Sequence, residues 1–251
     1  EFPFVPPDLE REIIIVDQSF QNPPATVSFL EANKEKFRYY HLDVACLPGA
    51  KNFGGSKAKG DIVAFLDDDF VIGPQFLRIM AENYRNPEVN CVVGKIISMR
   101  RGAKDSRLNF TGAKVGLSGR VFANWAYGKK GYAHCSGGPS VTLRKKIFEK
   151  VGGYDTSYIV TNHYEDLDFG YRLRKSGIKV MYEPGAVCVH MFYPKGGVRI
   201  ESDVETEYYR FRNGILFYLK NMNKFFLPYM LAIFFLIDIK KVLIPTRSLK
   251  N

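Results

Sequence analysis

The chain has 251 residues, of which 46% are hydrophobic and 25% are charged, and it carries a formal net charge of +10. This length allows one domain or two small ones with a sizeable core, and the composition excludes a largely disordered protein. The positive surplus favours anionic partners, such as phosphorylated substrates or an anionic membrane face, without choosing between them.

The N-terminal part of the chain alternates between apolar runs and helical patterns. "REIIIVDQS" (11–19) is typical of a buried strand, 24–37 has helical spacing, and 37–44 reads as a short strand. A loop leading into a helix is expected over 47–60, and "DIVAFL" (61–66) is typical of another buried strand. This order predicts an α/β fold with a mostly parallel central sheet flanked by helices.

The rest of the chain continues with mixed elements. The pattern predicts a helix over 73–86, a strand over 89–99, an irregular region over 100–135, a strand and a helix over 137–155, a helix over 163–177, and two short strands around Pro184-Gly185. Within the apolar segment 224–245, the run from Phe225 to Ile237 is too short to span a bilayer, and Pro228 and Asp238 interrupt the segment. It is either a buried core helix or a membrane-surface anchor, to which Lys240 and Lys241 would bring charges suited to anionic headgroups.

Cysteine usage and the start of the chain bear on location. The cysteines are scattered without metal-type spacing, at Cys46, Cys91, Cys135 and Cys188. We interpret them as reduced thiols of a cytoplasmic protein, and no signal peptide is visible in "EFPFVPPDLERE". The expected location is the cytoplasm, either free or peripheral at the inner face of the cell membrane.

Consecutive carboxylates follow the apolar run "IVAFL" directly. Strand geometry lets Asp67 and Asp69 point the same way, with Asp68 opposite. Mg²⁺ and Mn²⁺ are hard cations that take carboxylate oxygens, commonly together with substrate phosphates. The alternative is a solvated turn at the end of a strand.

A second acidic pair and a histidine complete the candidate residues. Glu165 and Asp166 lie at a predicted helix start, where the helix dipole favours carboxylates and where a general base is the functional alternative. His190 ends the strand "AVCVH" and is either a structural histidine or a nitrogen ligand of a Mn²⁺-type cation.

Taken together and in this order, these segments resemble family 2 glycosyltransferases of the GT-A fold. The resemblance runs from about residue 12 to about residue 221, and its strongest parts are "IIIVDQS", "LPGAKNFGGSKAKGDIVAFLDDD", "GGPSVTLRKKIFEKVGGYD" and "EDLDFGYRLRKSGIKVMYEPGAVCVH". It implies a transferase domain over 1–221, with 222–251 as an apolar and basic segment. The first strand of the family is missing or divergent here, where the chain reads "EFPFVPPDLER".

The resemblance also implies roles for individual residues. Asp166 would be the catalytic base, with Glu165 orienting acceptor or base, and Asp17 would contact the nucleotide base. Lys51 stands where the family usually has an arginine beside the nucleotide, which keeps the charge but loses the bidentate fork. The Mn²⁺ or Mg²⁺ ion would be held by Asp67, Asp69 and His190. The residues expected to bind the nucleotide sugar are Asp17, Lys51, Asp67, Asp68, Gly137 and Gly138.

The implied reaction moves a sugar from a nucleotide-sugar donor to a hydroxyl of a glycan or lipid-linked acceptor, with inversion. No nucleic-acid partner is expected. One alternative is a sugar-phosphate nucleotidyltransferase, which would be expected to carry a glycine-rich phosphate loop that is not visible near the N-terminus. Another is a non-catalytic membrane-associated binding or scaffold protein with a degenerate transferase fold.

Overall fold

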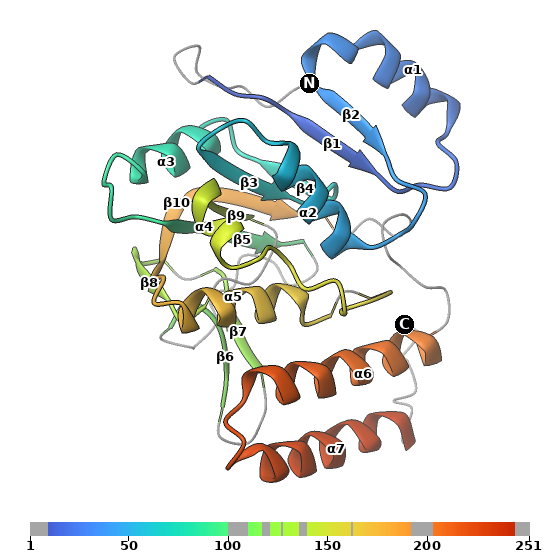
Figure 1. Ribbon diagram of the computed structural model, residues 1–251, viewed down its shortest axis with the longest axis vertical. Coiled ribbons are helices and arrows are strands. Elements are labelled where there is room, and N and C mark those ends of the chain that lie inside the picture. The colour runs from blue at the N-terminus through green and yellow to red at the C-terminus, as the bar shows by residue number, and fades with distance from the viewer. Residues whose placement is uncertain are drawn as a thin grey trace.

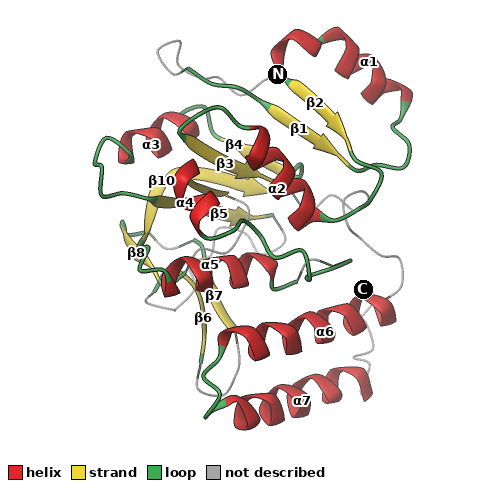
Figure 2. Ribbon diagram, viewed as in Figure 1, coloured by secondary structure: helices red, strands yellow, loops and turns green. Residues whose placement is uncertain are grey.

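The computed structural model describes residues 10–99, 110–116, 121–126, 128–135, 140–161, 163–191 and 203–243, without the side chains of 203 and 237–243. A small parallel unit lies at one end, a mixed sheet with helices lies in the middle, and a pair of helices lies at the other end (Figure 1). Helices and strands alternate through the first half (Figure 2), as the sequence predicts.

The N-terminal unit is a two-stranded parallel sheet with one connecting helix. Its elements are β1 (Ile14–Asp17), α1 (Pro24–Ala32), the 3₁₀ turn Lys34–Lys36 and β2 (Arg38–His41). The carboxylate of Glu12 accepts hydrogen bonds from the backbone N–H groups of Lys59 (2.5 Å) and Gly60 (3.0 Å), which ties this unit to the segment before the next strand. Among the described strands, β1 and β2 pair only with each other.

The main sheet has the strand order β3–β9–β5–β10–β4, and β8 pairs with the first residues of β10. Its strands are β3 (Ile62–Leu66), β4 (Phe70–Ile72), β5 (Cys91–Ser98), β8 (Gly131–Ala133), β9 (Ser140–Arg144) and β10 (Val180–His190). The α/β class is confirmed, but the prediction of a mostly parallel sheet is wrong. Of the described pairings in this sheet only β5–β10 is parallel. A strand buried on both faces reads as an apolar run whichever way its neighbours point.

Helix α2 (Leu47–Lys57) corrects another prediction, because the helix occupies most of the segment expected to begin as a loop. Glycine normally weakens a helix, but here two glycines permit close packing. A Cβ at Gly54 would lie 3.3 Å from Val16 Cγ2, and one at Gly55 would lie 2.5 Å from Phe148 Cε1. The close approach of α2 to β1 and to α4 (Lys145–Lys150) therefore requires residues that look like helix breakers.

Two further predictions of irregular or broken structure are also corrected. The region 100–135 contains β6 (Gly112–Val115), β7 (Val121–Asn124) and β8 among its described residues. The segment around Pro184-Gly185 is one strand, β10, with a bulge between Glu183 and Val187. The bulge absorbs the proline and glycine, which would otherwise interrupt the ladder.

Helices pack against the main sheet. Helix α3 (Phe76–Asn83) packs on β10 and β5, and α5 (Glu165–Lys175) contributes Phe169 and Leu173 to the central core. Glycine 177, at φ +77°, follows the end of α5, as predicted for its C-terminal cap.

The C-terminal helices α6 (Asp203–Asn221) and α7 (Leu227–Leu243) lie side by side (Figure 1). Met230 and Phe234 of α7 share a buried cluster with Phe217 and Tyr218 of α6, so one face of α7 is core. No helix in the described residues combines the length and apolarity needed to cross a membrane. The boundary at residue 221 stays a prediction, and the cysteines are free thiols, as predicted.

Candidate active site

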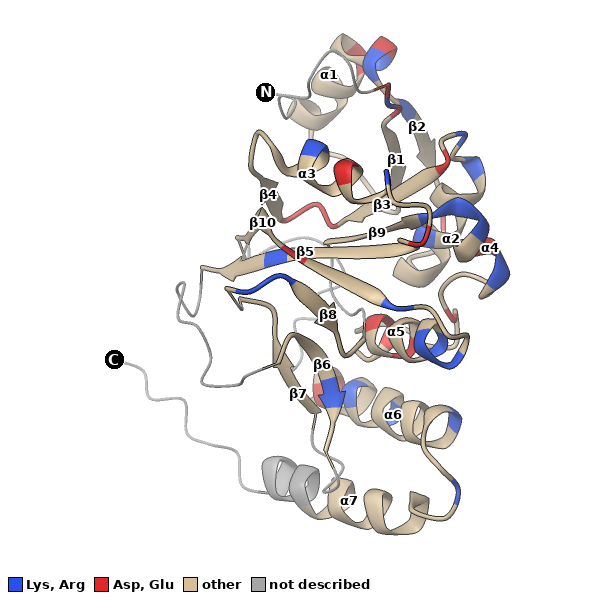
Figure 3. Ribbon diagram, turned by 90° about the vertical axis from the view of Figure 1, so that its left-hand side faces the viewer, with Lys and Arg blue, Asp and Glu red and all other residues tan. Residues whose placement is uncertain are grey.

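The predicted metal-binding aspartates lie in the turn between β3 and β4, where acidic residues are gathered (Figure 3). Asp68 is exposed, whereas the side chains of Asp67 and Asp69 are 26% and 16% exposed. The Phe70 N–H donates to the Asp67 carbonyl (3.3 Å), which closes the turn. The two outer aspartates are therefore the more buried ones, as the strand alternation predicts.

Strand β10 delivers His190 to the same turn. His190 stands opposite Phe70 in the antiparallel β10–β4 register, and the two rings stack at 4.3 Å. Its Nε2 lies 3.0 Å from Asp69 Oδ2, and the next residue, Met191, donates its N–H to the Asp69 carbonyl (2.9 Å). Two of the three predicted metal ligands are thus in direct contact.

Lys51 connects this turn with the second acidic pair. Its Nζ lies 3.1 Å from Asp166 Oδ1, 3.5 Å from Glu165 Oε1 and 3.7 Å from Asp67 Oδ1. The lysine side chain is 6% exposed, and that of Glu165 is 7% exposed. One buried ammonium group thus brings together carboxylates from two segments that lie about a hundred residues apart in sequence; we refer to these four residues as the Lys51 cluster.

Tyr154 and Asn52 hold the lysine in place, and the sequence predicted neither role. Asn52 donates from Nδ2 to the Tyr154 carbonyl (2.8 Å) and accepts from the Tyr154 N–H at Oδ1 (2.7 Å). The Tyr154 ring stacks on Phe169 at 4.2 Å, and Lys51 Nζ lies 4.8 Å from its centre. A Cβ at Gly153 would lie 2.4 Å from Asn52 Oδ1, which explains the glycine before Tyr154. The tyrosine has the pattern of an ordinary core aromatic, so nothing in the sequence marked it.

Burial and charge shift the proton affinities in this cluster. Burial, followed by the neighbouring Asp166, raises the pKa of Glu165 to about 8, with Lys51 opposing the shift. Burial also raises the pKa of Asp67, again against Lys51. For Lys51 burial alone would lower the pKa, but Asp166 and its other anionic neighbours outweigh it, so the pKa is well above the usual value. The ammonium group is therefore charged when the site is formed.

The loop before α5 has an unusual backbone. Val160 and Tyr164 have φ angles of +68° and +76°, a conformation that residues with side chains rarely adopt. For a β-branched residue such as Val160 it is a strained one. Strain of this kind persists where surrounding contacts impose it, often beside functional residues, and here it immediately precedes Glu165 and Asp166.

Other predicted site residues lie apart from the Lys51 cluster or outside the described residues. Asp17, at the end of β1, accepts hydrogen bonds from Tyr39 Oη (2.7 Å), Asn22 Nδ2 (2.5 Å) and the Ser19 N–H (2.8 Å). Burial alone would raise its pKa, but these hydrogen bonds lower the pKa to about 2. None of these partners belongs to the Lys51 cluster. Gly137 and Gly138 lie outside the described residues.

The donor groups fit a hard divalent cation that keeps non-protein ligands. In the described part of the chain, no group of three His, Cys, Asp or Glu side chains is arranged to hold an ion unaided. Asp67 Oδ1 is buried and has no hydrogen-bond partner among the described residues, and Asp69 and His190 offer oxygen and nitrogen donors nearby in the fold. Mg²⁺ and Mn²⁺ are commonly bound by one or two carboxylates together with substrate phosphates.

Much of the chain is similar to known glycosyltransferase sequences. Residues 7–152 match the profile of glycosyl transferase family 2. The chain is 25% identical over 179 residues to a pre-mycofactocin glycosyltransferase of Mycobacterium tuberculosis (strain ATCC 25618 / H37Rv), which covers 71% of this chain and 37% of that protein. It is 23% identical over 178 residues to the O-antigen biosynthesis protein RfbC of Myxococcus xanthus, covering 64% of this chain and 13% of that protein. The chain thus spans well under half the length of these relatives.

Solved structures share the fold. GalNAc-T7, crystallised with UDP, GalNAc and Mn²⁺, superimposes with a TM-score of 0.59 at 12% identity, covering 92% of this chain and 51% of that one. TarS 1-349 of S. aureus, in complex with UDP-GlcNAc, gives a TM-score of 0.59 at 15% identity, covering 95% of this chain and 67% of that one. At these identities the likeness concerns the fold alone.

Proposed function

Because the chain belongs to glycosyl transferase family 2, we propose that it transfers a sugar from a nucleoside diphosphate sugar to an acceptor hydroxyl, with inversion at the anomeric carbon. The observation that carries the proposal is the Lys51 cluster, in which Asp67, Glu165 and Asp166 surround one ammonium group. The turn that we propose to bind a cation and the proposed base thus contact the same ammonium group. The UDP-GlcNAc complex of TarS and the structure of GalNAc-T7 with UDP and GalNAc are consistent with such a donor.

In the proposed reaction Asp166 is the general base. Its carboxylate takes the proton of the acceptor hydroxyl, the hydroxyl oxygen forms a bond to the anomeric carbon, and the bond from that carbon to the phosphate oxygen breaks. The nucleoside diphosphate leaves with the bonding electrons. Glu165, buried beside Asp166, helps to orient the base or the acceptor. One displacement of this kind inverts the anomeric configuration.

The proposed cofactor is Mn²⁺ or Mg²⁺, held by Asp69 and His190 with Asp67 alongside. Such an ion, when bound, supplies Lewis-acid stabilisation of negative charge on the departing diphosphate. Asp68, which is exposed, and Asp17, at the end of β1, are the proposed protein contacts of the nucleotide sugar.

The proposal is tested by screening the purified protein against a panel of UDP-, GDP- and dTDP-sugars with Mn²⁺, Mg²⁺ or a chelator. We expect turnover of at least one donor that the chelator abolishes, and a product of inverted configuration by NMR. Asp166→Asn and Asp69→Ala should each lower turnover roughly a hundredfold or more. Glu149→Gln is a matched control, because that side chain is 60% exposed and lies on α4.

Other outcomes identify the alternatives. Release of pyrophosphate from a nucleoside triphosphate and a sugar phosphate would instead identify a nucleotidyltransferase. Sugar-nucleotide binding without turnover of any donor, with every acceptor class tried, would favour the scaffold alternative.

We also propose that the protein acts on a glycan or lipid-linked acceptor beside an anionic membrane surface. Phe225, in the turn before α7, is 84% exposed, and Tyr229 and Leu236 of α7 are 55% and 61% exposed. The spacing of seven residues places Tyr229 and Leu236 along one side of the helix. Lys224, next to Phe225, is exposed, and so is Lys220 on α6, which also forms an ion pair with Asp155. Exposed aromatic and basic side chains together suit a membrane interface. The cytoplasmic location stays a prediction.

Sedimentation with vesicles tests this membrane contact. We expect binding to vesicles of phosphatidylglycerol and phosphatidylcholine that high salt weakens, and loss of binding in Phe225→Ser/Tyr229→Ser. Phe20→Ser is a matched control, since Phe20 is fully exposed in the loop after β1. Equal binding of all variants would contradict the assignment. A dimer that the double substitution dissociates would show that a second copy covers this face instead.

A further inference from the structure

We propose that Lys51 is a positioning residue that acts through Asp166: its ammonium group joins the cation-binding turn to the acidic start of α5 and holds the base in place. The inference rests on the proposed function, in which Asp166 is the base. It assigns Lys51 a role different from the nucleotide contact that the family resemblance implies.

The surroundings of Lys51 leave little room for a nucleotide. The side chain is 6% exposed, and its Nζ has carboxylate oxygens at 3.1, 3.5 and 3.7 Å. Asp166 Oδ1 accepts a hydrogen bond from the ammonium group, and the oxygens of Glu165 and Asp67 lie at ion-pair distance from it. Because the ammonium group is buried among these oxygens, a phosphate or base could reach it only by displacing one of the carboxylates.

The position of the ammonium group is fixed from behind as well. Lys51 and Asn52 are neighbours on α2, and Asn52 pairs with both the N–H and the carbonyl of Tyr154. That pairing places the Tyr154 ring against the lysine, 4.8 Å from Nζ. The ring offers its electron-rich face to the cation and excludes water. The helix and the tyrosine together therefore determine where the charge lies.

Charge balance explains why the site needs a cation here. Asp67, Glu165 and Asp166 would repel one another if all were ionised around a buried space. Lys51 is the cationic side chain that, among the described residues, forms an ion pair with all three. Because it binds Asp166 at Oδ1, Oδ2 is the oxygen we expect to meet the acceptor hydroxyl.

The first test is a double-mutant cycle in stability, which needs no substrate. Lys51→Met should raise the unfolding equilibrium constant roughly a hundredfold or more, because buried carboxylates lose their counter-charge. In an Asp166→Asn background the same substitution should cost about tenfold less. Lys57→Met is the matched control on α2, since Lys57 is exposed. It should behave identically in both backgrounds.

Each result of this cycle decides the question. Equal effects of Lys51→Met in the two backgrounds would overturn the inference. If Lys51→Met does not fold but Lys51→Met/Asp166→Asn does, the coupling is supported in its strongest form. If neither folds, the inference is also overturned, because restoring the charge balance should have restored folding.

The second test separates positioning from a nucleotide contact and from a purely structural role. With a donor that the wild-type protein turns over, Lys51→Met should lower kcat at least tenfold with the donor KM changed less than about threefold. In the Asp166→Asn background it should lower kcat no further, because residues that act as a unit are not additive. A raised donor KM would support the nucleotide contact, and an additive loss would indicate structure alone.

The two proposals fail in distinguishable ways. If no sugar nucleotide is turned over, the proposed function fails, while the stability cycle still reports whether Lys51 and Asp166 are coupled. If transfer occurs but the cycles are additive, only the role of Lys51 is wrong.

Discussion

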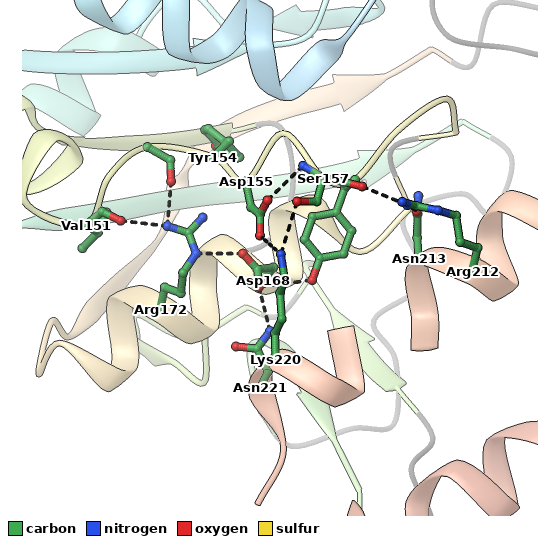
Figure 4. A network of polar contacts seen from close by, with 12 residues as sticks. Val151, Tyr154, Asp155, Ser157, Asp168, Arg172, Arg212, Asn213, Lys220 and Asn221 are labelled. Carbon is green, nitrogen blue, oxygen red and sulfur yellow. Dashed lines mark hydrogen bonds and ion pairs between the residues drawn. The ribbon is translucent and has the colours of Figure 1, made fainter. Parts of the chain in front are cut away.

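Helix α5 carries two buried acidic side chains, Glu165 and Asp168, less than one turn apart. They differ in the hydrogen bonds that surround them. Asp168 is 1% exposed and accepts hydrogen bonds from Asn221 Nδ2 (2.6 Å), Arg172 Nε (2.7 Å) and Tyr158 Oη (3.2 Å) (Figure 4). Arg172 in turn donates to the carbonyls of Val151 (2.9 Å) and Gly153 (2.7 Å). These bonds join α5 to the loop before it and to α6.

The Lys51 cluster, together with Tyr154 beside it, is charged but incompletely hydrogen-bonded. Asp67 Oδ1 and the Tyr154 hydroxyl are buried and lack hydrogen-bond partners among the described residues. Around Asp168, the acceptor oxygens are satisfied and the unpaired atom in that part is Arg172 Nη2. Buried polar groups are normally hydrogen-bonded. Unpaired oxygens beside the candidate cation-binding turn therefore point to a partner that the substrate or a cation supplies. Carboxylates whose oxygens are fully hydrogen-bonded within the protein indicate a structural role.

Helix α6, which contributes Asn221 to the hydrogen bonds around Asp168, also holds the loop before Glu165. Lys220 of α6 donates to Asp155 Oδ2 (2.5 Å), and Arg212 donates to the Ser157 carbonyl (2.8 Å). Asn213 adds a hydrogen bond to the Ile159 carbonyl (3.1 Å). The loop that leads to the strained residues before Glu165 is thus held by α6, which links the C-terminal helices to the geometry of the candidate base.

The largest expected effect on stability comes from removing the hydrogen-bonded carboxylate of Asp168. Asp168→Ala should lower the free energy of unfolding by about 3–5 kcal/mol, because Arg172 keeps its charge but loses its buried partner. Urea denaturation measures the change. Asp166→Ala is the matched control on the same helix, with a side chain that is 22% exposed. It should cost less than Asp168→Ala, because Lys51 keeps Glu165 and Asp67 as counter-charges. An equally large loss in both variants would contradict the distinction between the two groups.

The two sides should also respond to pH with opposite signs. The pKa of Glu165 is raised to about 8, so its contribution to stability is full below its unfolded pKa of about 4.3 and is lost as the pH rises toward 8. Between about pH 4.5 and about pH 8, wild type should lose more than about 1 kcal/mol relative to Glu165→Gln. Urea denaturation of both proteins across this range measures the difference.

Asp155 supplies the comparison. Burial alone would raise its pKa, but hydrogen bonds from Lys220 and the Ser157 N–H lower it below the usual value. Its stabilising effect is therefore present above the unfolded pKa of about 3.9 and is lost as the pH falls through the folded value. Relative to Asp155→Asn, wild type should gain less than about 1 kcal/mol as the pH rises through that range. Parallel slopes for the two acids would refute the assignment.

Much of the fold was accessible from the sequence because burial leaves a periodic record. The strands at 14–17, 62–66 and 91–98 were predicted as apolar runs, and α5 was predicted from its spacing and terminal glycine. Strand direction was not accessible, because it depends on which distant strands become neighbours. The start of helix α2 was predicted as a loop because its glycines serve packing against β1 and α4, which local propensity does not contain.

The acidic residues of the candidate site could be predicted from the sequence, but the buried lysine that they surround could not. The acidic residues at 67, 69, 165 and 166 stand out because carboxylates follow apolar strands or begin a helix. Lys51 was singled out only through the family resemblance, as a nucleotide contact. Its burial among the carboxylates was not predicted, and the Asn52–Tyr154 pairing beside it is part of the assembled fold. Contacts between residues a hundred positions apart are set by the assembled fold, and a single sequence does not record them.

Two tyrosine hydroxyls, four residues apart, sharpen the comparison at a smaller scale. The Tyr154 hydroxyl is buried without a partner in the described residues, whereas that of Tyr158 donates to Asp168 Oδ1 at 3.2 Å. Tyr154→Phe should raise the free energy of unfolding by about 1 kcal/mol, because an unsatisfied buried group is removed. Tyr158→Phe should lower it by a similar amount, about 1 kcal/mol. Thermal and urea denaturation of the pair measure both, and equal signs would contradict this account of the two sides.

The smallest expected effect concerns backbone strain. Val160, in the loop before the base, and Gly177, after α5, have nearly the same φ, +68° and +77°, but only the second residue is suited to it. Val160→Gly should relieve about 1–2 kcal/mol of strain and lose part of it to the greater freedom of the unfolded chain, for a net gain of about 0.5–1 kcal/mol.

The same conformation, tested in reverse, should give the opposite sign. A Cβ at Gly177 would meet nothing within 4 Å, so Gly177→Ala isolates the conformational cost, and we expect a loss of about 1 kcal/mol. If the strain at Val160 helps to place Glu165 and Asp166, the stabilised Val160→Gly protein should also have a lower kcat, whereas Gly177→Ala should leave kcat unchanged. A Val160→Gly protein that is both more stable and fully active would show that this loop is strained for reasons unrelated to the site.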